Sequence, residues 1–343
     1  MRKSVLLLVS CSMLASCGGG GGSGGGSVVV NPAPTPTPGP IPTPTPTPTP
    51  GPGTLNTGEV KPAADATFIA ATMELVTTGG ASQTNGVITG GATNSRLTTL
   101  DTPQFSGSYN NGYRLADAIN SVQFWPEHLT RDDTSPNGNG TVLFTKITGE
   151  IHDYLALYQQ TTYSSSSKGS GYTMARYGGS AGWQHTIVEG SARRSRLNYL
   201  AYGTATAPGA MPRSGVVKFS LLGSGNYATD TDLWFLSSGT SNFLTVDFGT
   251  GVVSGQLGLG GQNFYKNVVG GIGYIRIEGS LSGNSMTGAL ADSSLGAYSG
   301  IPGQFRLMFV GPSANEVVLT YVVNSGTQAA VGAAVGVIDP YAL

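Results

Sequence analysis

Gly215-Val-Val-Lys-Phe-Ser-Leu-Leu-Gly223 and Leu244-Thr-Val-Asp-Phe248 both alternate apolar and polar residues with a period of two. Because successive residues of a β-strand point to opposite faces, each stretch offers one apolar face to a core and one polar face to water. Phe248 is separated from Val252 by only Gly249-Thr250-Gly251, in which glycine tolerates positive φ. The sequence therefore predicts a tight antiparallel hairpin.

Four segments in a fixed order carry a family resemblance: Met211-Pro-Arg-Ser-Gly215, Leu244-Thr-Val-Asp-Phe-Gly-Thr-Gly-Val-Val-Ser-Gly255, Gly303-Gln-Phe305 and Phe309-Val-Gly-Pro-Ser-Ala-Asn-Glu316. Together they resemble the β-barrel domain of transferrin-binding protein B-like surface lipoproteins, over roughly residues 195–338. The family usually has Gly-Gly directly after the glutamate, whereas this chain has Val317-Val318. The resemblance implies an all-β fold, with a barrel preceded by a strand-rich handle.

The N-terminus has the features of a bacterial lipoprotein leader. Arg2-Lys3 is followed by a short apolar run and by Leu14-Ala15-Ser16-Cys17, which resembles a lipobox. We expect a signal peptide over residues 1–17, lipidation of Cys17 and anchoring to the outer membrane, because glycine and not aspartate follows the cysteine. An ordinary secretory signal is the alternative. Cleavage removes Cys11, so no internal disulfide is expected.

A low-complexity linker follows over residues 18–60. It is Gly/Ser-rich at first and then repeats Thr-Pro, which favours an extended polyproline II spacer on the order of 70 Å long. We expect this tether to be disordered and to hold a folded body away from the membrane. The formal net charge of the chain is -1, which gives no electrostatic reason to expect nucleic acid as a partner.

The region 61–190 is expected to be handle-like and rich in strands. Thr67 to Thr78 is consistent with a strand or a short helix, and Tyr113 to Asn120 has Leu115, Ala118 and Ile119 at helical spacing. Asp132 to Gly140 has the composition of a loop. Strands are predicted at 142–147, 153–158 and 172–177.

The region 191–343 is expected to form an eight-stranded antiparallel up-and-down barrel, which leaves no exposed sheet edge. A ninth apolar run at 328–338 is a candidate to pair with the first strand. A membrane-spanning barrel is the structural rival, but the strands are shorter than a membrane crossing needs. The eight predicted strands are 195–206, 215–223, 242–248, 252–259, 272–281, 285–291, 304–310 and 316–323.

The sequence offers no recognisable catalytic or metal site. His128, His152 and His185 lack zinc-site spacing, and no nucleophile elbow is present. We therefore expect no enzyme activity and no cofactor. Aromatic residues beside Gly/Ser-rich segments are the better candidates for ligand contact, because exposed aromatic rings are favoured anchors for protein partners. These candidates are Trp183, Trp234, Phe235, Phe264 and Tyr265.

The favoured hypothesis is a surface binding protein. The resemblance implies that such a lipoprotein captures a protein or small solute, and that it assists an outer-membrane TonB-dependent receptor in the uptake of iron or another nutrient. An adhesive or structural surface lipoprotein without a transport role is the alternative, and an enzyme is a third. The sequence does not identify a ligand.

Overall fold

The computed structural model describes residues 66–78, 87–88, 96–98, 113–116, 119–132, 140–158, 161–166, 169–229, 232–238, 242–264, 266–296, 298–325 and 328–341. The predicted signal peptide, Cys17, the linker and most of the predicted loop at 132–140 lie outside these residues. None of the helices among the described residues has the length and apolar character of a membrane span.

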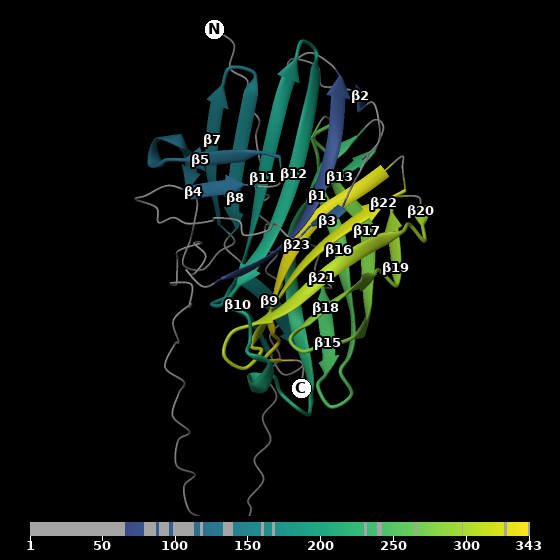
Figure 1. Cartoon of the computed structure of the whole chain (residues 1–343). Coiled ribbons are helices and arrows are strands. Elements are labelled where there is room, and N and C mark those ends of the chain that lie inside the picture. The colour runs from purple at the N-terminus through teal and green to yellow at the C-terminus, as the bar shows by residue number, and fades with distance from the viewer. Residues whose placement is uncertain are drawn as a thin grey trace, which may run out of the picture.

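The described residues of the first part of the chain form an antiparallel sheet of eight strands, here called the handle sheet (Figure 1). Its strand order is β2-β1-β12-β11-β8-β7-β6, and β3 also pairs with β1. Residues 67–78 are thus a strand. The bounds are β1 Thr67–Thr78, β2 Val87–Ile88, β3 Arg96–Thr98, β6 Leu129–Asp132, β7 Thr141–Thr148, β8 Ile151–Tyr158, β11 Gly178–Glu189 and β12 Ala192–Gly203.

A short hairpin of β4 (Tyr113–Ala116) and β5 (Ser121–Phe124) packs against one face of the handle sheet. A 3-10 turn, η1 (Pro126–His128), follows it. The expected helix at 113–120 is therefore wrong. Tyr113 and Leu115 are each 1% exposed, whereas Ile119, which the helical spacing required on the apolar face, is 72% exposed. The segment follows the period of two of a β-strand and not the period of a helix, because only one face of the hairpin packs against the core.

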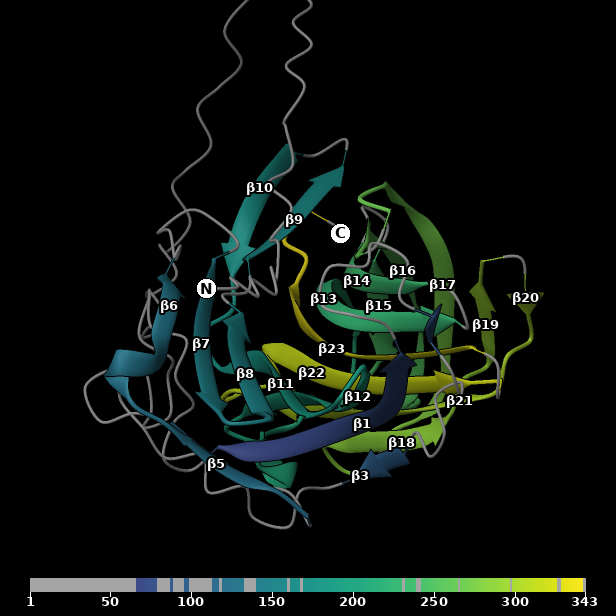
Figure 2. The same cartoon turned by 90° about the horizontal axis from the view of Figure 1, so that it is seen from above.

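A second hairpin, here called the arm, consists of β9 (Thr161–Ser166) and β10 (Gly169–Met174). In the described part of the chain, these two strands pair only with each other. We predicted a strand at 172–177, and β10 begins and ends three residues earlier. Figure 2 shows the arm standing at the margin of the molecule, near the C-terminus.

The second part of the chain forms a closed antiparallel barrel. β14 and β15 both pair with β13 and β16 and so act as one interrupted strand, and β18 and β19 together connect β21 to β17. Counted in this way, the described residues give eight barrel strands in up-and-down order. The bounds are β13 Val216–Thr229, β14 Leu233–Ser238, β15 Phe243–Asp247, β16 Val252–Asn263, β17 Val269–Ser280, β18 Ser285–Ala289, β19 Asp292–Leu295, β21 Gly303–Val310, β22 Glu316–Asn324 and β23 Gln328–Ile338, with the short β20 Tyr298–Ser299 beside β19 and the 3-10 turn η2 Pro208–Ala210 before β13.

One of the eight expected barrel strands is placed differently. The segment 195–206, predicted to open the barrel, lies mostly in β12, which pairs with β1 and β11 of the handle sheet. The ninth run, 328–338, closes the barrel as a candidate strand should, because β23 pairs with β22 and with β13, the first strand of the observed barrel. Alternation identifies a strand but does not say which sheet it joins, since that depends on residues far away in the sequence.

Side chains fill the barrel interior. Phe219, Leu244, Ile275, Phe305 and Phe309 are among the fully buried residues of this core. The outward positions of the same strands carry charges, including half-buried Lys218 and exposed Arg276 and Glu278. This polarity is that of a barrel in water, with the apolar side chains inside.

The hairpin that first indicated the fold is built as the sequence predicts. Val246 faces the core, and the Oδ1 atom of Asp247 accepts hydrogen bonds from the backbone N–H groups of Gly249 (2.8 Å) and Thr250 (3.3 Å). Gly251 has φ of +74°, which favours glycine. A Cβ at Gly255 would lie 2.4 Å from the carbonyl oxygen of Phe243. The residues of the Leu244–Gly255 segment, which carry part of the family resemblance, are therefore those that this tight turn requires.

The handle sheet and the barrel share an apolar core. Met73 of β1 and Leu197 and Ala201 of β12 pack with residues on the outer faces of β22 and β23, such as Val318 and Val335. Figures 1 and 2 show β22 and β23 lying between the handle sheet and the rest of the barrel. The two parts are therefore joined by a buried apolar interface.

Candidate functional site

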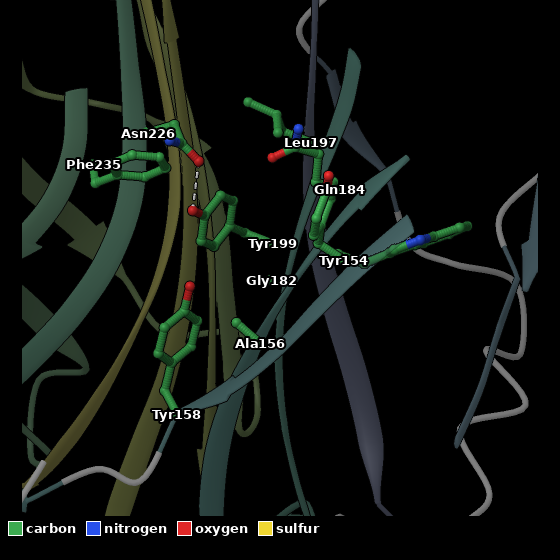
Figure 3. Close-up of a pocket in the computed structure, with 10 residues that line it drawn as sticks. Tyr154, Ala156, Tyr158, Gly182, Gln184, Leu197, Tyr199, Asn226 and Phe235 are labelled. Atoms are coloured by element: carbon green, nitrogen blue, oxygen red, sulfur yellow. Dashed lines mark hydrogen bonds between the residues drawn. The ribbon is translucent and has the colours of Figure 1, made fainter. Parts of the chain in front are cut away.

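A small cavity lies where the handle sheet meets the wall of the barrel (Figure 3). The handle strands β8, β11 and β12 supply most of its lining, and the barrel strands β13 and β14 supply the rest. The lining residues are Tyr154, Ala156, Tyr158, Gly182, Trp183, Gln184, Leu197, Tyr199, Asn226 and Phe235.

One buried hydrogen bond crosses the cavity from the handle sheet to the barrel. The Tyr199 hydroxyl donates to Oδ1 of Asn226 at 2.6 Å, and each residue is 4% exposed. The Asn226 amide donates in turn to the carbonyl oxygen of Trp234 at 3.3 Å. Figure 3 shows the ring of Tyr199 between Tyr158 and Asn226. This bond therefore fixes the position of the handle sheet relative to β13.

Both tyrosine hydroxyls of this cluster remain protonated at neutral pH. Burial raises the pKa of Tyr158 to about 12, and burial also raises the pKa of Tyr199 well above its ordinary value. Neither hydroxyl is then an acid or a base near pH 7. The two hydroxyl groups therefore act as structural hydrogen-bonding groups and do not transfer protons.

The cavity is too small to hold a ligand. Its volume is about 20 Å³, which accommodates one water molecule. Pockets for small molecules are typically about 300–1,000 Å³. A partner that binds here must therefore contact the surface around the opening.

Phe235 and Phe264 make an aromatic pair beside this cavity. Their ring centroids are 5.5 Å apart and the rings are steeply inclined at 76°. Phe235 is the cross-strand partner of Asn226, and both residues of the aromatic pair are half-buried. Part of each residue thus remains accessible for contact with a partner.

The structure separates the five aromatic residues that the sequence singled out. Trp183 is 1% exposed, and its Nε1 atom donates to Oδ1 of Asp153 at 3.1 Å inside the handle. Trp234 packs against the barrel core and belongs to β14, which lies between the predicted strands 215–223 and 242–248 and was not itself predicted as a strand. Phe235 and Phe264 come together, whereas Tyr265 and Cys17 lie outside the described residues.

A row of polar residues crosses four neighbouring strands of the handle sheet. The register aligns Asp153, His185, Arg196 and Glu74 on β8, β11, β12 and β1. His185 Nδ1 lies 2.9 Å from Asp153 Oδ1, and Arg196 pairs with Glu74. Among the described residues, no three His, Cys, Asp or Glu side chains gather as a metal site. Sequence reasoning missed this row because its members are far apart along the chain.

No protein-family model matches the chain, and no curated protein matches it. Among solved structures, it is similar to a Transferrin Binding Protein B double mutant from Haemophilus parasuis, with 15% identity, a TM-score of 0.45, and 79% of this chain and 45% of that chain covered. A second is isotype 1 Transferrin Binding Protein B from Neisseria meningitidis, with 13% identity, a TM-score of 0.40, and 78% and 43% covered.

A third similar structure is HpuA from Kingella denitrificans in complex with human haemoglobin. It shares 15% identity and has a TM-score of 0.30, with 60% of this chain and 87% of that chain covered. The chain spans less than half the length of either Transferrin Binding Protein B structure that it matches.

Proposed function

We propose that this protein is a surface lipoprotein that binds a partner protein. A lipid on Cys17 anchors it to the outer membrane, and residues 18–60 hold the folded body away from the bilayer. The body captures a protein that carries iron or another nutrient and assists a TonB-dependent receptor in its uptake. The leader, the Thr-Pro tether and the sequence resemblance support this proposal.

The packed interior of the barrel is the observation that carries the proposal. Aromatic and aliphatic side chains occupy the space in which a lipocalin-type barrel would hold a small ligand. The cavity at the handle accommodates only a water molecule. Binding therefore takes place on the outer surface, and a protein partner fits such a surface better than a small solute does.

Phe235 and Phe264 are the contact residues that we propose. The two rings support each other, so they lose little side-chain freedom when a partner covers them. Aromatic anchors of this kind account for much of the binding energy of protein interfaces. Trp183 is buried in the handle core and Trp234 packs against the barrel core, whereas Tyr265 remains a proposed contact next to Phe264 in the sequence.

Binding to intact cells that display the full-length chain tests this function. The probes are human haemoglobin, with which HpuA was solved, and human transferrin. We expect one of them to bind, and Cys17→Ser to abolish both acylation and cell-surface binding. Absence of binding to both probes contradicts the assignment to these carriers.

A matched pair of variants tests the contact residues. The double substitution Phe235→Ala and Phe264→Ala should weaken binding about 30-fold or more, as expected for aromatic hot spots. Phe243→Ala is the control, because Phe243 lies on another part of the barrel wall, beneath Lys218. Equal affinities for the two variants would exclude the aromatic pair as the anchor.

A further inference from the structure

The cavity between the handle sheet and the barrel separates two surfaces of different chemistry. Figure 3 shows Phe235 of the barrel and Tyr154 of the handle sheet on opposite sides of it. On the handle side the surface continues along β11 and β12, whose ends reach past the barrel in Figure 1. A partner protein that covers Phe235 therefore also comes close to the barrel-facing side of these handle strands.

The barrel side of the cavity is apolar. Phe264 packs against Phe235, and the strand register places Val269, which is 65% exposed, in the same row as Phe235. The loop between β16 and β17 also carries Lys266, whose ammonium group pairs with Asp232 at 2.6 Å. This side thus offers apolar contact to a partner, and the charge of its lysine is already paired.

The handle side carries a positive charge without a counter-ion. Arg193 on β12 is half-buried, and it makes no hydrogen bond or ion pair with any residue in the part of the chain that the structure describes. The next residue, Arg194, lies on the other face of the strand and pairs with Glu189 at 3.2 Å. Because alternate strand residues share a face, Arg193 lies on the same face as Leu197, which lines the cavity.

The Arg193 side chain lies near two residues of β8. The register aligns His152 with Ser195 across β11, and Arg193 lies two residues from Ser195 on the same face. Burial lowers the pKa of His152, and the charge of Arg193 lowers it further against the opposing effect of Asp153. Arg193 also opposes the rise in pKa that burial gives to Tyr154. The guanidinium group is therefore close to Tyr154 and, through it, to the cavity.

The chemistry of the two sides determines what a partner must present. A guanidinium group donates N–H groups in a planar fork and has no acceptor, so its best protein partner is a carboxylate. When a partner excludes water from the handle side, an unpaired Arg193 becomes costly, whereas an acid facing it restores the lost interactions. The aromatic pair on the other side favours an apolar side chain.

We propose that these two surfaces together bind one segment of the partner protein, in which an Asp or Glu side chain lies next to an apolar side chain. The carboxylate pairs with Arg193, and the apolar side chain packs on Phe235 and Phe264. This inference rests on the proposed function, because it assigns a chemistry to the contact segment of the partner. The ion pair gives specificity for the acid, and the aromatic contact gives most of the affinity.

Selection from a phage-displayed random-peptide library tests this chemistry. The library is depleted on cells that lack the protein and then selected on cells that display the full-length chain. Enriched peptides should contain Asp or Glu next to an aromatic or aliphatic residue. In a selected peptide, replacing the acid with its amide should weaken binding about tenfold or more, as expected for the loss of a charge-assisted hydrogen bond. A selection that enriches no peptide, or only peptides without an acid, overturns the proposal.

Three substitutions test whether Arg193 reads the acid. Arg193→Gln should abolish the difference between the acidic peptide and its amide counterpart, and Arg193→Lys should retain part of it because the charge remains without the fork. Arg194→Gln is the matched control on the opposite face and should keep the full difference. The amide peptide should bind Arg193→Gln as tightly as wild type, which shows that the surface is intact. Retention of the acid preference in Arg193→Gln, or loss of binding by both peptides, refutes the role of Arg193.

The aromatic side is tested with the same two peptides. The double substitution Phe235→Ala and Phe264→Ala should weaken both peptides by a similar factor and leave the preference for the acid unchanged. Unchanged binding of both peptides would show that they do not use the aromatic pair and would overturn the two-sided surface. Neither haemoglobin nor transferrin enters these measurements, so a failure of the carriers to bind and a failure of the acid preference are separate results.

Discussion

Replacing Tyr199 with phenylalanine tests the polar connection between the handle sheet and the barrel. The substitution keeps the ring and removes only the hydroxyl that donates to Asn226 at 2.6 Å. The amide of Asn226 still donates to Trp234. The change therefore leaves the Asn226 acceptor without its donor and also removes the hydroxyl that hydrogen-bonds to Tyr158.

The magnitude follows from the burial of both groups. A buried acceptor that loses its partner costs about 1–3 kcal/mol of folding free energy. The adjacent cavity of about 20 Å³ already accommodates one water molecule, and a water that moves into hydrogen-bond range of Asn226 brings the loss toward the lower end. For a folded body of this size, each kcal/mol lowers the Tm by about 2–4 °C.

Urea unfolding followed by tryptophan fluorescence, together with calorimetry, measures the loss. Tyr154→Phe is the matched control, because it removes a hydroxyl from the same cavity without affecting the bond to Asn226. We expect Tyr199→Phe to be less stable than this control by at least about 1 kcal/mol. If the two variants are equally stable, the Tyr199 hydroxyl does not contribute to the joint, and the reasoning fails.

Three further predictions concern the packing and the turns. Gly178→Ala should lose about 1–3 kcal/mol because the added methyl meets the barrel wall, whereas Gly209→Ala, which meets nothing within 4 Å, should be near neutral in urea unfolding. Met73→Ala should cost about 2–5 kcal/mol from the shared core while unfolding remains a single calorimetric transition; two separated transitions would show that the handle and barrel unfold independently. Hydrogen bonds with Thr250 and Gly249 lower the pKa of Asp247, so its carboxylate contributes stability above pH 3.8 that is lost at lower pH. Asp247→Ala should abolish this contribution. Urea midpoints measured between pH 2.5 and pH 6 that fall in parallel for wild type and variant would contradict this.

Strands with one solvent-exposed face and one buried face were predictable from the sequence. β15 shows this alternation over its whole length and β13 shows it over 221–225, because water meets one side of the barrel wall and the packed interior meets the other. The same reasoning failed at Tyr113–Ala116, where a four-residue strand is too short for its period to exclude a helix. β14 was missed because its two adjacent aromatic residues face opposite environments, and we interpreted them only as candidates for ligand contact.

The candidate site was much less accessible from the sequence than the strands were. Tyr199 and Asn226 lie 27 residues apart, and the Glu316 carboxylate lies 138–140 residues from the backbone N–H groups of residues 176–178, which donate to it. Pairing over such distances depends on how two sheets pack, which local periodicity does not encode. Phe235 and Phe264 were identified as aromatic candidates, but their contact was not, since it depends on the pairing of β14 with β16.

One sequence signal does report how the two halves are joined. β23 is apolar at almost every position and rich in alanine and glycine, and its first ten residues are buried. Such a continuous apolar run is typical of a strand that is covered on both faces. Here the barrel core covers one face, through Ala330 and Ala334, and the handle sheet covers the other, through Val331 and Val335.

The small residues of β23 also let the neighbouring layers approach closely. A Cβ at Gly332 would lie 2.5 Å from the Tyr321 hydroxyl, and one at Gly336 would lie 2.7 Å from a methyl group of Val317. Because this strand is shared by both packing interfaces, a displacement of the handle sheet would require the barrel wall to repack. A partner that touches both the handle and the barrel therefore meets a surface that is already formed, and binding it costs little conformational entropy.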